Sequence, residues 1–151
     1  MNLQNKYHYP VISGTMLEAF PEIRERYTKE IRWISETFQG NSTRGQSLYF
    51  DHCFCDFLGQ LLAAESTDNR QLERVFDFLE NMASSDDADV RDLLQVTVLE
   101  YLRSWHILQR NSEMLMQPET KKIFNKVKQY LGEPPQGALP YFAPLRSKLK
   151  G

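Results

Sequence analysis

Residues 72–102 read LERVFDFLENMASSDDADVRDLLQVTVLEYL, and this stretch decides the fold. Apolar residues recur at steps of three and four on both sides of a short acidic break, which is the period of an α-helix. The first set is Leu72, Val75, Phe76, Leu79 and Met82, and the second runs from Val90 to Trp105. The break SSDDAD supplies residues that cap helix N-termini. The stretch therefore predicts two antiparallel helices, from a cap at Thr67 or Asp68 to about residue 82, and from about 88 to 105.

Two further helices are expected on the N-terminal side of this hairpin. One begins at Pro21, carries apolar residues through Phe38 at helical spacing and stops at Gly40. The other spans about Ser47–Ala64 around an apolar stripe of five residues, Phe50, Phe54, Phe57, Leu58 and Leu61. Residues 1–14 show no such period and are predicted to be irregular. Thr15-Met16-Leu17-Glu18 fits a capping box, with the Thr15 hydroxyl accepting from an early amide and Glu18 reaching back.

A fifth helix is expected to start at Pro118 and stop at Gly132, with Ile123 and Val127 inward. The stretch QRNSEMLMQ (109–117) before it fits either a helix extension or a loop. Residues 133–151 hold four of the seven prolines and cannot form one continuous helix. The apolar run LPYFAPL in this Pro-rich tail is expected to pack on the body of the protein.

Together these patterns predict an all-α protein, a single domain over residues 1–151 built as an antiparallel bundle of five to six helices. A length of 151 residues is that of one domain and allows a sizeable core. The composition, 41% hydrophobic and 25% charged, is that of a soluble globular protein. The first residues lack a basic stretch followed by an apolar one, and no apolar run approaches a membrane span. We therefore expect a cytoplasmic protein with reduced thiols.

The stretch YFDHCFCD (49–56) holds both cysteines and one of three histidines, and so is the obvious place to look for chemistry. On a helix, Cys53 and Cys55 lie about 200° apart and point to opposite flanks. They then cannot share a metal ion or form a relaxed disulfide, and we expect them to be small fillers of the core. His52 and Asp56 are one turn apart on the outer face, which suits a surface contact or a contact with a partner.

No other motif in the chain names a reaction. There is no Gly-rich phosphate loop, no nucleophile elbow and no Glu-x-x-His pair for a di-iron bundle site. We expect no catalytic residue, no metal and no cofactor. An enzyme that uses His52, Asp56 or Cys53 stays open as an alternative, as does an adaptor or scaffold.

Charge is the most informative feature, because it is unevenly spread. Residues 65–100 carry 3 basic and 10 acidic side chains, a net charge of −7, whereas residues 103–151 carry 9 basic and 3 acidic ones, a net charge of +6. Helix caps account for one or two of these acids but not for the whole excess. A surface of this kind repels nucleic acid and attracts basic proteins. The candidate partner-binding residues around the hairpin turn are Glu80, Asp86, Asp87, Asp89 and Asp92.

The basic C-terminal third offers a different function. Lys121, Lys122, Lys126 and Lys128 lie on one predicted helix, and Arg146, Lys148 and Lys150 follow in the tail. Such a surface is able to bind nucleic acid, although no helix-turn-helix or RNA-binding signature accompanies it. A nucleic-acid-binding or scaffold module is therefore the alternative reading.

The stretch 72–102, with FLE before the acidic turn and DVRDLL…VTVLEYL after it, resembles small all-helical bacterial immunity proteins of contact-dependent growth inhibition systems. The resemblance covers about a fifth to a quarter of the chain. It implies a non-catalytic cytoplasmic inhibitor that binds a cognate basic toxin, often a nuclease domain, and covers its active site. In that case the acidic residues, with His52 and Asp56, would carry recognition.

Overall fold

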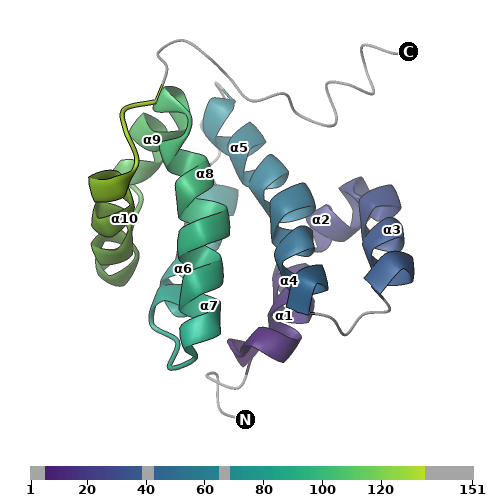
Figure 1. Ribbon diagram of the computed structural model, residues 1–151. Coiled ribbons are helices and arrows are strands. Elements are labelled where there is room, and N and C mark those ends of the chain that lie inside the picture. The colour runs from purple at the N-terminus through teal and green to yellow at the C-terminus, as the bar shows by residue number, and fades with distance from the viewer. Residues whose placement is uncertain (1–5, 39–42, 65–68, 135–151) are drawn as a thin grey trace.

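A computed structural model describes residues 6–38, 43–64 and 69–134, and all regular secondary structure in these ranges is helical (Figure 1). The all-α prediction is therefore confirmed. The described residues form eight continuous helices, more than the five or six expected. In chain order their segments are η2 (Tyr9–Val11) with α1 (Ile12–Ala19), α2 (Pro21–Arg26), α3 (Thr28–Phe38), α4 (Thr43–Tyr49) with η3 (Phe50–Phe54) and α5 (Cys55–Ala63), α6 (Asn69–Ala83), α7 (Ala88–Leu93) with η4 (Leu94–Leu99) and α8 (Glu100–Arg103), α9 (His106–Glu113), and α10 (Pro118–Tyr130).

The hairpin predicted from residues 72–102 is present. In Figure 1, α6 descends to a tight turn and α7 leaves that turn to run back beside it. Asp87 has an extended backbone and caps α7, its carboxylate accepting a hydrogen bond from the Asp89 amide at 2.9 Å. The helix that follows ends at Arg103, two residues before the predicted end, because Trp105 adopts an extended backbone and α9 begins in a new direction at His106.

The N-terminal segment differs from the prediction. Residues 9–19 are helical, so the chain is ordered well before residue 15. Thr15 is not a cap, because it lies inside α1 and its hydroxyl donates to the carbonyls of Lys6 and Val11. The buried side chains of Ile12 and Met16, both 0% exposed, explain the earlier start: they tie this turn to the core.

The single helix predicted from Pro21 does start there but is divided at Tyr27. Tyr27 has φ −113° and ψ 35°, outside the helical range, so that α2 and α3 meet at an angle. The Thr28 hydroxyl donates to the carbonyls of Arg24 and Glu25, a side-chain competition with the backbone that bends helices. This bend places α3 at the edge of the molecule, on the right of Figure 1.

The core is one contiguous cluster that draws on every helix of the described chain. Its centre is aromatic. The ring centroid of Phe20 lies 5.4 Å from that of Phe78, in an edge-to-face arrangement, and 5.9 Å from that of Phe54. Such pairs stabilise a core beyond the area they bury. The rod α4–η3–α5 and the rod α7–η4–α8 both contribute, and they lie side by side across the middle of the bundle (Figure 1).

Some predictions fall on residues outside the described ranges. They are the cap at Thr67 or Asp68, the Gly40 stop, and the packing of the Pro-rich tail beyond residue 134, with its LPYFAPL run and its basic residues Arg146, Lys148 and Lys150.

Candidate functional site

An acidic groove runs between the rods α4–η3 and α7–η4–α8. Two adjoining hollows form it, of about 280 Å³ and about 360 Å³, and both are lined by Ser47, Val96 and Thr97. Val96 lines both hollows and has 58% of its surface exposed, so the centre of the groove is apolar.

Carboxylates surround this apolar centre. Asp89 and Asp92 line the smaller hollow, and Glu100 and Asp51 line the larger one. Three of them stand on the rod α7–η4–α8, and Asp51 stands on the opposite wall. Among the described residues that line the two hollows, none carries a positive charge. Because the walls are partly apolar and concave, they concentrate the negative field in the groove.

Two of the predicted partner-binding residues, Asp89 and Asp92, are thus at the groove, and Asp86 is not among the residues that line it. Asp86, in the turn that precedes α7, is exposed and its Oδ1 lies 3.3 Å from His8 Nε2. Hydrogen bonds to the amides of Tyr9 and Asp89 outweigh burial and lower the pKa of neighbouring Asp87. Asp87 therefore holds the N-terminal segment to the start of α7, because its carboxylate accepts hydrogen bonds from both.

Glu80 also has an internal role. Its carboxylate accepts hydrogen bonds from the backbone amides of Glu119 and Thr120, at 3.0 and 2.9 Å, and from the Thr120 hydroxyl at 2.9 Å. These amides are the first of α10 and have no partner within their own helix. Glu80 on α6 therefore caps a helix 40 positions further along the chain.

His52 and Asp56 contact different neighbours. Asp56 accepts a 2.6 Å hydrogen bond from the Tyr27 hydroxyl and a 2.8 Å bond from Gln60. Burial, together with the hydrogen bond and charge of Asp56, raises the pKa of Tyr27 strongly, so the phenol stays protonated and donates. Asp56 thereby fixes the bend between α2 and α3 onto α5.

His52 lies on the outer side of η3, next to the groove. Its Nε2 is 4.0 Å from Asp51 Oδ2, and its ring meets the Trp33 indole edge-on at a centroid distance of 5.8 Å. The surface therefore continues from Asp51 over His52 to Trp33 on α3, which is 49% exposed.

The two cysteines are buried, as the fillers of a core should be. Cys55 Sγ lies 3.5 Å from the Thr97 carbonyl on η4, so it faces the neighbouring rod. Burial, with the charges of Glu30 and Asp56, raises the pKa of Cys53 to about 12, and burial raises that of Cys55 well above the usual value. Neither thiol is poised to ionise at neutral pH.

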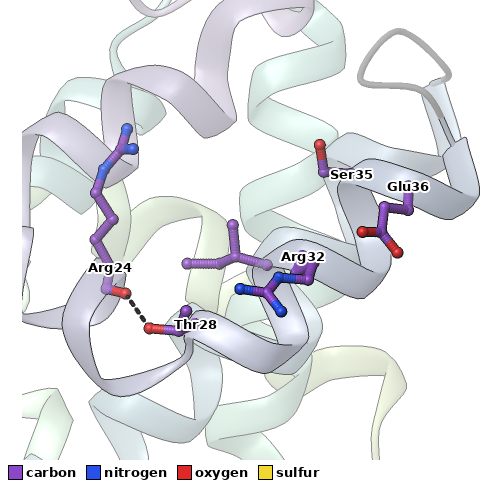
Figure 2. A pocket seen from close by; sticks show the side chains of 6 residues that line it. Arg24, Thr28, Arg32, Ser35 and Glu36 are labelled. Atoms are coloured by element: carbon purple, nitrogen blue, oxygen red, sulfur yellow. Dashed lines mark hydrogen bonds between the residues drawn. The ribbon is translucent and has the colours of Figure 1, made fainter.

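A third hollow, of about 350 Å³, lies along α2 and α3 and is lined by Arg24, Thr28, Ile31, Arg32, Ser35 and Glu36. Figure 2 shows these side chains, with the Thr28 hydroxyl bonded to the Arg24 carbonyl and Arg32 beside it. Its lining mixes both charges on exposed side chains, so it selects no ligand class as clearly as the acidic groove does.

Within residues 6–38, 43–64 and 69–134, no three His, Cys, Asp or Glu side chains are placed to hold a metal ion together. In the same ranges no helix has the length and apolar character to cross a bilayer.

The fold and the groove define a small all-helical protein with an acidic concave surface. The chain belongs to the family described as a domain of unknown function (DUF7674), whose sequence profile matches residues 14–132. No curated protein and no solved structure matches the chain.

Proposed function

We propose that this protein is a non-catalytic, cytoplasmic binding protein that neutralises a cognate toxin by covering a cationic surface of it with the acidic groove. The observation that carries the proposal is the placement of four carboxylates around exposed Val96 with no basic side chain among the described lining residues. Charge-depleted apolar centres with a polar rim are typical of protein interfaces. The resemblance of residues 72–102 to immunity proteins supplies the kind of partner, a basic toxin such as a nuclease domain.

The groove supports a protein partner better than a small substrate. Its carboxylates lie on two helical rods along an open surface, and complementary charge on a partner would speed encounter and fix orientation. Desolvated contacts at Val96 and at the neighbouring Trp33 would add the short-range part of the affinity. In a nuclease the matching cationic surface is the cleft that binds phosphates, so covering it would block substrate.

The proposal is tested by co-purification of the partner, followed by an assay of protection from its toxicity. The tagged protein is expressed in its own cells together with the products of adjacent genes, and the bound proteins are identified. We expect a stoichiometric basic domain that is toxic alone and harmless in the complex. Reversal of two groove charges, Asp89→Lys with Asp92→Lys, should abolish protection.

The control reverses two exposed charges outside the groove, Glu25→Lys with Glu73→Lys, and so changes net charge equally. Protection by this control and loss with the groove variant would support the proposal. Recovery of nucleic acid instead of protein would overturn it and favour the lysines of α10. Lys121 and Lys126 there are exposed, whereas Lys122 pairs with Glu119 and Lys128 with Glu113.

A further inference from the structure

The spacing of side chains along the groove specifies its occupant more closely. Asp92, Val96 and Glu100 follow one another at steps of four residues on a continuous helical rod, and Asp89 precedes them by three. Asp89, Asp92 and Val96 line one hollow, and Val96 and Glu100 line the adjoining one. These four side chains, here called the row, therefore place an apolar position between acidic ones along the groove.

The opposite wall completes a groove of matching character. Ser47, Leu48 and Asp51 of α4 and η3 face Val96, Thr97 and Glu100 across the larger hollow. This wall adds a fourth carboxylate and a second, partly buried apolar side chain, Leu48. An occupant thus meets negative charge on both sides and apolar surface at the centre.

Both walls are helices, which decides the backbone form of the occupant. The backbone groups of a helix bond within the helix, so the walls offer no free row of donors and acceptors. An extended peptide placed here would gain no backbone hydrogen bonds from either wall. A helical occupant satisfies its backbone internally and needs only side-chain contacts, as in other helix-in-groove complexes.

We propose that the groove takes one amphipathic cationic helix of the partner, with an apolar side chain on Val96 and a basic side chain one turn away on each side. The inference rests on the proposed function and deepens it, since it states what the neutralised partner presents. The basic side chains pair with Asp92 and Glu100, and a further one reaches Asp51 or Asp89.

The test uses a synthetic peptide of about 15 residues, long enough to span the row. The helix-forming sequence places leucine at the centre with lysine four residues before and after it. A scrambled peptide of the same composition separates leucine and lysine onto different faces. Affinities for the full chain are measured by fluorescence anisotropy at low salt, and circular dichroism checks that each protein variant is folded.

The patterned peptide should bind at least about fivefold more tightly than the scrambled one. This ratio corresponds to the binding free energy gained by burying one small apolar contact. Val96→Asn should remove that advantage, and Asp89→Lys with Asp92→Lys should weaken both peptides. Equal binding of the two peptides, with the charge dependence kept, would overturn the helix and leave the acidic surface standing. Binding that ignores the charge reversal would overturn both this inference and the proposed function.

Discussion

The two thiols of YFDHCFCD show how a reactive-looking motif becomes inert through packing. Cys53 and Cys55 are at most 1% exposed, and burial holds the pKa of both well above neutrality. We expect the folded protein to resist alkylation by a thiol reagent at pH 7, and to be alkylated at both sites in denaturant. Mass spectrometry of the two reactions checks this. Rapid modification of either cysteine in the folded protein would revive the enzyme alternative.

Glu22 carries a pH dependence of stability. Burial acts to raise its pKa, but hydrogen bonds from Arg74 and Gln71 outweigh burial and hold the pKa at about 2. The unfolded chain has a carboxyl pKa of about 4.3. The folded state therefore favours the charged form, and this stability is present above pH 4.3 and is lost as the pH falls to about 2. Glu22→Gln should lower the free energy of unfolding by about 1 kcal/mol at pH 7.

Urea unfolding at pH 7, 4 and 2.5 measures this effect. The difference between wild type and Glu22→Gln should shrink as the pH falls. Glu25→Gln, an exposed carboxylate on the same helix, is the matched control and should change little. A difference that stays constant over the whole range would show that Glu22 acts through packing and not through its charge.

Trp33 is an exposed aromatic residue on α3, supported edge-on by Phe38 at a centroid distance of 6.2 Å and by His52, the neighbour in sequence of the groove residue Asp51. Trp residues dominate many interface energies because a rigid ring removes a large area from water. Trp33→Ala should weaken binding of the protein partner about tenfold or more while leaving the melting temperature nearly unchanged. Val11→Ala, also an exposed apolar position, is the control. Unchanged affinity would confine the interface to the groove itself.

At the scale of single residues, the sequence located the acidic side chains but not the groups to which they hydrogen-bond. Asp89 and Asp92 were correctly placed on the surface of the hairpin, because their position beside the turn is local information. Glu80 has its hydrogen bonds on α10, and contacts so distant in sequence leave no local signal. Val96 and Glu100 were missed although their spacing from Asp92 is helical: a row that alternates acidic and apolar positions was the available signal.

At the scale of elements, hydrophobic period located the helices better than it located their breaks. The hairpin, the helix before it and the helix from Pro118 were all predicted, because each buries a stripe repeated at three and four residues. The bend at Tyr27 and the π-helical segments η3 and η4 were not. The bend is held by a contact distant in sequence, the Tyr27 hydroxyl on Asp56.

Glu80 makes a test of one such long-range contact, because it caps α10 from α6. Glu80→Gln keeps the shape but removes the negative charge that complements the helix N-terminus. We expect a loss of about 1–2 kcal/mol in the free energy of unfolding. Glu73→Gln, exposed on the same helix, should have almost no effect. If Glu80→Gln weakened partner binding without lowering stability, the assignment of Glu80 as a cap would be wrong.

At the scale of the whole molecule, the uneven charge acquires a structural meaning. Three acids of the acidic segment, Asp89, Asp92 and Glu100, line a groove along α7, η4 and α8, and the basic α10 lies at the left of Figure 1. The small net charge of −2 thus hides a large separation of negative and positive charge along the chain. Such a molecule is oriented by the field of a charged partner before contact. Asp86, exposed in the turn before α7, contributes to that field, with its Oδ1 3.3 Å from His8 Nε2.

This polarity predicts how binding of a basic protein partner depends on salt. Reversing Asp86, Asp89 and Asp92 to lysine should lower the association rate constant at least tenfold in low salt, with a smaller change in the dissociation rate, because exposed charges act mainly on encounter. Asp87 is left intact, since its reversal would uncap α7 and confuse stability with binding.

Raising salt towards physiological strength shortens the screening length to about 8 Å and should bring variant and wild type closer together. Stopped-flow association at several salt concentrations measures both effects. The control reverses Glu18, Glu25 and Glu73, exposed carboxylates outside the groove, and should keep most of the wild-type rate. Equal slowing by both triple variants would mean that net charge alone steers the partner. The prediction that the groove sets the orientation in which the two proteins meet would then be wrong.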